Sequence, residues 1–485
     1  MQLRFYNTAS RKVEDFHPLT DGEVRMYHCG PTVYQRPHIG NFRAFLFADL
    51  LRRLFDLLDY KVIQVMNLTD VGHLLNDADD GEDKLEVQAR KEKIDPWQLV
   101  EKVSKQFFID LDALDVRPAH HYPRATDHIP EMVDIIRTLL EKGNAYKVGE
   151  NIYFDVHSFP GYGNLSGNRI EDLEAGARIQ VNEEKRHPAD FALWKSDERH
   201  IMKWDTEFGA NGFPGWHVEC SAMAMKYLGE SFDIHTGGED NVFPHHECEI
   251  AQSECATGVT FATTWMHTKF LKVDGGKMSK SLGNAYNLND IAERGYSPLD
   301  FRFLILKSHY RGSLNFSWDA LKSAAEGRSS LADFKGRLEA GARESDGESV
   351  NGIGDDPAAN PDSLIARAES KFFASVCEDL NTSAALSAVF DLRNHFIKQG
   401  LPPDKCRQAL AFLSKVDCLF GLFESAEGGE DAQRLSDADV EKLIALRIAA
   451  RASNDWAQSD AIRDQLAGAG VVVEDTTDGM HWHRG

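Results

Sequence analysis

The sequence lacks any apolar run of the ~18–20 residues that a membrane-spanning helix requires, although 42% of its 485 residues are hydrophobic. Its start lacks the basic stretch followed by an apolar stretch that marks a secretory signal, and nothing there is typical of a transit peptide. Cysteine is sparse, and its count of seven is odd, so a disulfide framework is not expected. These absences favour a cytoplasmic protein that contacts no membrane.

Positive charge is also in short supply. The chain has 54 Lys and Arg residues against 77 Asp and Glu residues, which gives a formal net charge of −23. Taken alone, this balance argues against a nucleic-acid partner, because proteins bind the phosphate backbone with Lys and Arg. A large protein can nevertheless carry a basic face on an acidic body, so the motifs decide this question. The length predicts roughly three or four domains.

What the sequence does contain is a strand–helix–strand pattern near its start. Residues 24–29 and 61–66 are typical of buried strands, and residues 41–58 between them repeat apolar side chains at helical spacing. The pattern returns with a strand at 231–235, followed by a glycine pair and a helix. Such units predict a parallel sheet with right-handed crossovers, in which ligands bind at the carboxyl ends of the strands.

The rest of the chain divides into shorter stretches. The sequence predicts, in chain order, an insertion with short extended pieces at about 140–195, a polar linker at 344–360, helices from about 363 to 423, a second polar break at 424–431, a long helix at 437–466 and a terminal hairpin formed by 471–475 and 481–482. The part of the chain after about residue 276 is therefore mostly helical.

The first motif that carries chemistry is Pro37-His38-Ile39-Gly40-Asn41, between a predicted strand and a predicted helix. Gly40 lets a ligand approach the backbone closely. The helix N-terminus offers N–H groups and a positive dipole end, which suit a phosphate. His38 could hydrogen-bond phosphate oxygens, although a lone His in this place is more often a helix cap or a surface residue.

The second motif is Lys277-Met278-Ser279-Lys280-Ser281, which follows a glycine pair and precedes another glycine. A loop with two lysines can place positive charge on the pyrophosphate that leaves a nucleoside triphosphate. A random Lys-x-x-Lys is more often a solvated basic turn. Here the two motifs occur in order, one in each half of a parallel-sheet domain, and this favours the functional interpretation.

A third group of residues could bind a metal ion. Cys29 ends the first strand, Cys220 follows in the chain, and His245 and Glu249 are four residues apart on one helix face. Two thiolates, one imidazole and one carboxylate form a plausible tetrahedral zinc set. A His/Glu pair at this spacing is usually helix surface, and four neighbours compete for the same role: His28, His246, Glu247 and Cys248. Spacing alone does not choose among them.

The sequence resembles the class I aminoacyl-tRNA synthetases, which carry a His-Ile-Gly-His motif early and a Lys-Met-Ser-Lys-Ser motif late. The second motif is complete here, and the first departs from the family pattern at Asn41, which can donate a hydrogen bond but carries no charge. Four further segments resemble the cysteinyl-tRNA synthetases: Met-Tyr-His-Cys-Gly at 26–30, Gly-Trp-His-Val-Glu-Cys-Ser-Ala-Met at 215–223, His-Thr-Gly-Gly-Glu-Asp at 235–240 and Phe-Pro-His-His-Glu-Cys-Glu-Ile-Ala-Gln at 243–252. A further departure is Thr69-Asp70-Val71-Gly72-His73, where many members continue with acidic residues.

The resemblance implies a cysteine–tRNA ligase that activates L-cysteine with ATP and transfers it to the terminal adenosine of tRNA(Cys). It implies one Zn²⁺ per chain, with Mg²⁺ accompanying ATP. By carry-over, the site residues are the zinc ligands Cys29, Cys220, His245 and Glu249, the catalytic residues His38, Asn41, Lys277 and Lys280, the ATP-binding residues Gly40, Asp240 and Lys280, the cysteine-binding residues Gly30, Thr69 and Trp216, and the motif residues Pro31, Thr32, Met278, Ser279 and Ser281. The protein is expected to be a monomer.

The same resemblance implies a fold class and a domain plan. The expected fold is α/β, with a Rossmann-like parallel-sheet catalytic domain, an inserted connective subdomain and C-terminal α-helical tRNA-binding domains. The expected segments are the first half of the catalytic domain at 1–140, the insertion at 141–195, the second half at 196–275, the Lys277–Ser281 loop with a stem-contact region at 276–330, a helical bundle at 331–430 and an anticodon-recognition domain at 431–485. Five residues could read the anticodon: Arg447, Arg451, Trp456, Arg463 and Trp482.

Two alternatives remain at this point. One is a related ligase that joins cysteine to an aminosugar and lacks the terminal anticodon-reading region. The other is a non-catalytic paralogue that acts as a zinc-stabilised RNA-binding module. The complete Lys277–Ser281 motif argues against the second alternative, whereas Asn41 leaves it open.

Overall fold

The computed structural model describes residues 2–72, 74, 81–170, 184–278, 283–343, 361–423, 444, 447, 459, 462, 471–476 and 479–484. The chain forms two compact units, residues 1–422 and residues 423–485. Among the described residues, no helix is both long and apolar enough to cross a membrane.

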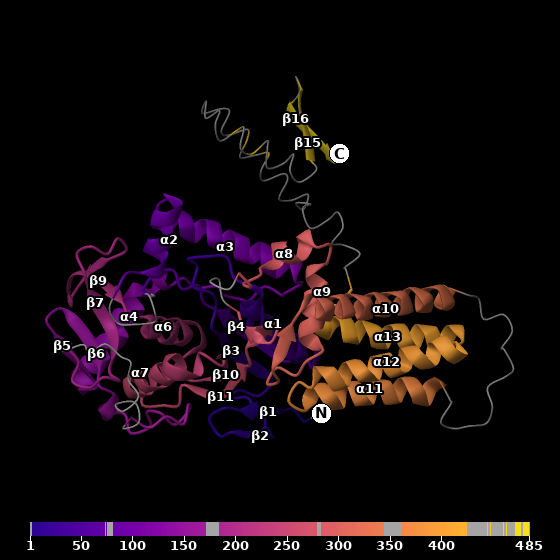
Figure 1. Cartoon of the computed structure of the whole chain (residues 1–485), viewed down its shortest axis with the longest axis horizontal. Coiled ribbons are helices and arrows are strands. Elements are labelled where there is room, and N and C mark those ends of the chain that lie inside the picture. The colour runs from indigo at the N-terminus through magenta and orange to yellow at the C-terminus, as the bar shows by residue number, and fades with distance from the viewer. Residues whose placement is uncertain are drawn as a thin grey trace. The chain divides into compact units, whose positions relative to one another are not determined.

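A four-stranded parallel sheet lies at the centre of the first unit (Figure 1). Its order is β11 (Ala262–Thr268), β10 (Phe232–Gly238), β3 (Glu23–His28) and β4 (Lys61–Met66). The connection from β3 to β4 contains α1 (Ile39–Leu57), and the connection from β10 to β11 contains α7 (Glu247–Thr257). The predicted strand–helix–strand unit at 24–66 is therefore confirmed, as are the strand and the helix predicted from residue 231, and β11 completes a second unit that was not predicted. Because the two connections leave in opposite directions from β3 and β10, ligands are expected between the carboxyl ends of these two strands.

Helix α1 contributes many apolar side chains to the core of this domain. Its 19 residues bury a stripe of Phe and Leu side chains against the sheet, and its first turn contains no acidic residue. The same helix buries Asp49, which accepts hydrogen bonds from Arg53 Nε (2.8 Å) and Arg302 Nη2 (2.6 Å). Arg53 also donates to the main-chain carbonyl of Cys418, and Arg302 donates to that of Phe420. Both carbonyls lie in the last turn of the helix Pro403–Phe420. A buried ion pair and these contacts with carbonyls thus join the parallel-sheet domain to the helical region.

The insertion forms a sheet of its own. Its strands pair antiparallel in the order β5 (Ala145–Val148), β6 (Asn151–Phe154), β7 (Phe191–Ser196), β9 (Gly209–Pro214) and β8 (Trp204–Thr206). Strands β8 and β9 lie beyond residue 195, where the insertion was predicted to end. The predicted domain boundaries remain predictions. Immediately after this sheet comes α6 (Trp216–Leu228), which carries Cys220.

Further elements surround the central sheet. They are the hairpin β1 (Arg4–Asn7) and β2 (Lys12–Asp15) and the helices α2 (Lys84–Glu92), α3 (Pro96–Ala113) and α4 (Ile129–Lys142). A three-stranded sheet of order β13 (Gly276–Lys277), β12 (Leu271–Val273) and β14 (Leu314–Phe316) follows β11 in the chain. The chain then continues with α8 (Leu288–Glu293) and α9 (Pro298–Leu306).

The end of the first unit is helical, as predicted. Helices α10 (Trp318–Arg343), α11 (Pro361–Cys377), α12 (Thr382–Gln399) and α13 (Pro403–Phe420) lie side by side (Figure 1). In the second unit, β15 (Val471–Thr476) and β16 (Gly479–Arg484) pair antiparallel, which confirms the terminal hairpin. The predicted linker at 344–360, the polar break at 424–431 and most of the predicted helix at 437–466 lie outside the described residues.

Candidate metal centre and active site

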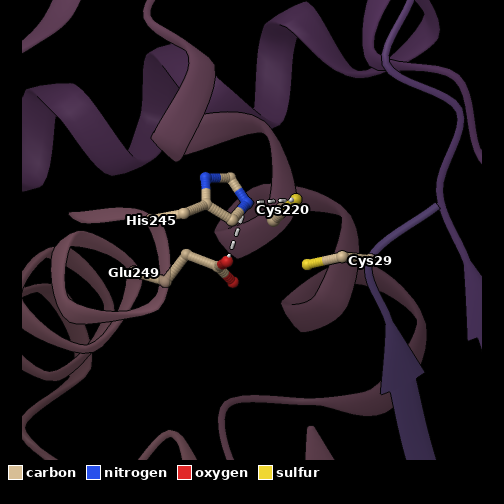
Figure 2. Close-up of side chains that lie close together, drawn as sticks. All are labelled: Cys29, Cys220, His245 and Glu249. Atoms are coloured by element: carbon tan, nitrogen blue, oxygen red, sulfur yellow. Dashed lines mark hydrogen bonds and ion pairs between the residues drawn. The ribbon is translucent and has the colours of Figure 1, made fainter. Parts of the chain in front are cut away.

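Four potential metal ligands meet near the carboxyl ends of β3 and β10 (Figure 2). Cys29 directly follows β3, and Cys220 lies in the second turn of α6. His245 belongs to a π-helical turn at Val242–His246, and Glu249 lies in the first turn of α7. Cys29, Cys220 and the His245/Glu249 pair come from segments that are far apart in sequence, so only the fold brings the four side chains together.

The four ligand atoms all lie within 4.8 Å of one another. His245 Nε2 is 3.5 Å from Cys220 Sγ and 3.1 Å from Glu249 Oε1. Four ligands bound to Zn²⁺ at ordinary bond lengths are separated by ~3.3–3.8 Å. The cluster is therefore close to the size that a tetrahedral zinc ion requires.

Burial also makes the cluster suitable for a cation. The side chains of Cys220, His245 and Glu249 are at most 2% exposed, and burial raises the pKa of the Glu249 carboxyl well above its usual range. Glu249 Oε1 is buried, and none of the described residues forms a hydrogen bond with it, although His245 Nε2 is near. A buried carboxylate oxygen in this situation is costly unless a proton or a cation compensates it. The residues present therefore fit a zinc ion.

A second ligand set overlaps the first. Cys29, His235, His246 and Glu249 also bring their ligand atoms within 4.8 Å of one another. Cys29 Sγ is 3.1 Å from His246 Nε2, and Glu249 Oε2 is 2.9 Å from His235 Nε2. The two sets share Cys29 and Glu249, but only the first contains a second thiol, which favours zinc.

Three of the four residues that compete for the role of metal ligand lie outside both ligand sets. Glu247 accepts main-chain hydrogen bonds from Gly163 N (2.8 Å) and Ser166 N (2.9 Å), and Cys248 Sγ is 3.5 Å from the Tyr162 hydroxyl. His28 Nδ1 is 2.6 Å from the Thr236 hydroxyl. Among the competitors, only His246 belongs to a described ligand set.

Further histidines surround the cluster, and sequence reasoning missed most of them. His217 Nδ1 is 2.9 Å from His245 Nδ1, and His246 Nδ1 is 2.8 Å from His267 Nε2. Burial lowers the pKa of His235 and of His267 to about 3, so both are neutral. A sequence signal did exist, because His235 lies in the middle and His267 near the carboxyl end of two adjacent parallel strands, on the side where ligands bind.

The residues predicted to bind cysteine border the same region. Gly30 N donates to Asn67 Oδ1 (2.8 Å), and Asn67 Nδ2 donates to the Thr69 hydroxyl (3.0 Å). Residue 30 must be small, since a Cβ there would lie 1.7 Å from Asn67 O. Pro31 O accepts from Thr69 N (3.1 Å), and Thr32 forms a parallel bridge with Thr69. Asn67 was not predicted, yet its place directly after β4 could have suggested it.

Trp216, also predicted to bind cysteine, lies against the metal cluster. It is the first residue of α6, and its ring stacks on the His245 ring with 4.3 Å between centroids. The structure thus brings Gly30, Pro31, Thr32 and Thr69 together at one edge, and Trp216 against a potential metal ligand.

The first sequence motif forms the N-terminus of α1. His38 is the N-cap residue, and its N–H donates to Asn41 Oδ1 at 3.0 Å. Asn41 is exposed there, with its amide N–H groups at the positive end of the helix. A Cβ on Gly40 would lie 3.5 Å from Met278 Cε, and Ile39 N donates to Tyr286 O at 2.8 Å. Met278 of the second motif and Tyr286 after it therefore reach the first motif.

Several predicted site residues cannot be placed fully. Ser279, Lys280 and Ser281 lie outside the described residues, as does the side chain of Lys277. Asp240 follows β10, and its carboxylate turns back so closely that a Cβ on Gly238 would lie 2.3 Å from Asp240 Oδ1.

Comparison with known proteins decides the family. Residues 15–326 match the model of the class I (C) tRNA synthetase catalytic domain, residues 371–424 match the DALR domain, and residues 435–482 match the cysteinyl-tRNA ligase anticodon-binding domain. The chain is 42% identical to a cysteine–tRNA ligase of Chlorobaculum tepidum over 499 residues, with 99% of each chain covered. It is 43% identical to one of Thermus thermophilus over 494 residues, with 99% of each chain covered. The chain belongs to the cysteinyl-tRNA synthetase family.

Solved structures agree with a cysteinyl-tRNA synthetase fold of class I. A methionyl-tRNA synthetase of Mycobacterium tuberculosis in complex with methionyl-adenylate matches with a TM-score of 0.62 at 15% identity, over 85% of this chain and 93% of that chain. The ternary LeuRS–tRNA–LeuAMS complex of Agrobacterium radiobacter matches with a TM-score of 0.61 at 11% identity, over 84% of this chain and 85% of that chain. At these identities the likeness concerns the fold alone, and it confirms the predicted fold class.

Proposed function

We propose that this cysteinyl-tRNA synthetase family member activates L-cysteine with ATP and transfers it to the 3′-terminal adenosine of tRNA(Cys). The observation that carries the proposal is the buried group of Cys29, Cys220, His245 and Glu249 beside the ligand-binding edge of a class I catalytic domain. We also propose that the protein acts in the cytoplasm as a monomer.

Zinc would be held by these four side chains, and when bound it supplies a soft Lewis acid that prefers a thiolate to a hydroxyl. This preference matters because cysteine and serine differ by one atom, and shape separates such isosteres poorly. The two ligand sets share Cys29 and Glu249, so these two side chains would hold the ion whether Cys220 and His245 or His235 and His246 complete the site. Selection at binding would then make a separate editing step unnecessary.

The cysteine itself would lie between Trp216, Gly30 and Thr69. Trp216 stacks on His245, so its ring would close one side of the pocket and exclude water from the thiol. Asn67 holds Gly30 and Thr69 together through both ends of its amide. This arrangement would orient the substrate carboxylate toward the nucleotide.

ATP, as its Mg²⁺ complex, would place its phosphates at the N-terminus of α1. The exposed Asn41 amide and His38 are the donors there, beside the positive end of the helix, and Gly40 permits close approach. Lys277 and Lys280 would neutralise charge on the leaving pyrophosphate, and Asp240 would hold the ribose. The chemistry is positioning and electrostatic stabilisation, so no general base is assigned.

The second unit would read the tRNA anticodon. Its match to an anticodon-binding domain supports this assignment. RNA loops are read by aromatic and Arg side chains that contact splayed bases, and the candidates are Arg447, Arg451, Trp456, Arg463 and Trp482.

The experiment is a pair of assays on the zinc-loaded protein. Cysteine-dependent ATP–pyrophosphate exchange tests whether the chain is a catalyst, and charging of tRNA(Cys) tests the acceptor. Activity in both assays is expected. Exchange without tRNA charging would favour a cysteine ligase with another acceptor, such as an aminosugar. Absence of exchange from folded, zinc-loaded protein would contradict the catalytic proposal and favour an RNA-binding module.

A further inference from the structure

Arg43 is a buried arginine whose environment differs from that of the other arginines on α1. It is 2% exposed, and among the described residues no carboxylate forms an ion pair with it. Burial lowers the pKa of its guanidinium to about 10, so it remains charged at neutral pH. A buried charge without a carboxylate partner is costly unless hydrogen bonds compensate it.

The compensation comes from five main-chain carbonyls. Arg43 Nη1 donates to the carbonyls of Lys269 (2.8 Å) and Phe270 (3.0 Å). Arg43 Nη2 donates to those of His309 (3.1 Å), Tyr310 (3.3 Å) and Gly312 (2.6 Å). A planar guanidinium can hold two separate loops in this way, whereas a lysine ammonium has only three donors at one point.

The two loops held by Arg43 lead into neighbouring strands. Residues 269–270 connect β11 to β12, and residues 309–312 precede β14. Strand β12 pairs with β14 on one side and with β13 on the other. Because β13 ends at Lys277, Arg43 fixes the base of the small sheet from which the second sequence motif begins.

The turn at 269–270 is also held from the opposite side. The N–H of Phe270 donates to Glu239 Oε1 at 2.7 Å, and the Lys269 side chain pairs with the same carboxylate. Glu239 N in turn donates to Thr268 O at 2.9 Å. Glu239 thus binds the turn through N–H groups while Arg43 binds its carbonyls, and the turn has little freedom to shift.

Arg43 lies on the same helix as the first motif. It follows Asn41 by two residues, so one rigid element carries both the phosphate-facing helix N-terminus and the guanidinium. At the far end, Met278 lies next to Gly40, and Tyr286 O accepts from Ile39 N. The second motif and the segment after it therefore contact the helix N-terminus directly, through Met278 and Tyr286. Arg43 holds the loops that lead into β12 and β14 of the small sheet from which the second motif begins.

We propose that Arg43 is a positioning residue for ATP activation, which sets the distance between the His38–Asn41 helix terminus and the β12–β13 hairpin that leads into Lys277. This inference rests on the proposed function. A displacement of about 1 Å in such a site can reduce the rate by about 100-fold. The loss of Arg43 should therefore impair use of ATP without altering the cysteine pocket, which is built from other elements.

The test compares four variants in cysteine-dependent ATP–pyrophosphate exchange. Arg43→Gln removes the charge and most donors, and Arg43→Lys keeps the charge with fewer donors. Glu239→Gln weakens the contacts with Lys269 and Phe270 that hold the same turn from its other side. Arg52→Gln is the matched control, because Arg52 lies on the same helix but bonds to Asp56 and His120. Each variant is also measured for its melting temperature and for its Kd for cysteine in the absence of ATP.

The expected result is a loss in kcat/KM for ATP of about 100-fold in Arg43→Gln and about tenfold in Arg43→Lys. Glu239→Gln should lose a smaller factor, Arg52→Gln should stay within about twofold of wild type, and the Kd for cysteine should not change. If Arg43→Gln does not fold, Arg43→Lys and Glu239→Gln carry the test. Wild-type values of kcat/KM for ATP in both would overturn the inference, as would an equal loss in cysteine affinity. An inactive wild type would instead contradict the proposed function.

Discussion

The contact between His217 and His245 allows a specific prediction about the metal centre. Their Nδ1 atoms are 2.9 Å apart, so one ring donates a proton to the other. If His245 Nδ1 carries the proton, His245 Nε2 has a lone pair that faces Cys220 Sγ at 3.5 Å and Glu249 Oε1 at 3.1 Å. A hydrogen bond to the remote nitrogen fixes the tautomer and the orientation of a metal-binding histidine.

Replacement of His217 by Phe keeps a ring in the buried space and removes this hydrogen bond. Loss of such a partner typically weakens metal affinity by about 10–100-fold, which corresponds to about 1.4–2.7 kcal/mol. The measurement is the Kd for Zn²⁺ by competition with a chelator of known affinity. His157→Ala serves as the control, because His157 is exposed in the insertion.

We expect the Kd of His217→Phe to rise by at least about tenfold and that of His157→Ala to equal the wild-type value. A folded His217→Phe variant that binds zinc with wild-type affinity would refute the reasoning. In that case either His245 would not be a ligand or its orientation would be set by the Trp216 ring, which stacks on it.

Three more predictions concern the surrounding residues. Gly30→Ala places a Cβ against the Asn67 carbonyl, so the KM for cysteine in exchange should rise by about 5- to 150-fold, because overpacking costs ~1–3 kcal/mol; an unchanged KM would contradict this. Burial raises the pKa of Asp70 to about 6 from 3.8, so folding favours its neutral form and stability falls by up to about 3 kcal/mol as pH rises from about 4 to 6. Urea unfolding should show this loss of stability between about pH 4 and 6 in wild type and not in Asp70→Asn. An equal dependence of the free energy of unfolding on pH in the two proteins would contradict the prediction. Asp49→Ala removes the carboxylate that pairs with buried Arg302 and leaves buried Arg53 paired with Asp115, so urea unfolding should show a loss of about 3–5 kcal/mol, and a loss below about 1 kcal/mol would argue against the buried pair.

The parallel sheet could be predicted because its strands and crossover helices are strongly patterned. Strand β4 begins and ends at the predicted residues 61 and 66, and α1 covers most of the predicted 41–58. The insertion was predicted only as extended pieces, because its strands are short and their pairing depends on contacts distant in sequence. Strands β8 and β9 were not predicted, since their residues show no clear alternation of apolar and polar side chains.

The residues of the site could likewise be predicted only in part. Cys29 could be placed near the ligand edge from the end of its strand, whereas the choice of Cys220, His245, Glu249 and Asp240 came from family resemblance. The π-helical turn at Val242–His246 turns His245 toward Glu249 and Cys220, and helical spacing does not predict it. Arg43 could not be found from sequence, because an arginine on an amphipathic helix is normally exposed and the carbonyls that bind it are more than 220 residues away.

Selection of cysteine by a zinc-bound thiolate is tested most directly by ATP–pyrophosphate exchange with cysteine and with serine. The proteins to compare are wild type, Cys220→Ser and the control Cys418→Ser, whose thiol is exposed. We expect exchange with cysteine and none with serine in wild type and in Cys418→Ser, and a collapse of cysteine-dependent exchange together with zinc content in Cys220→Ser. Wild-type exchange and selectivity in Cys220→Ser would contradict the account.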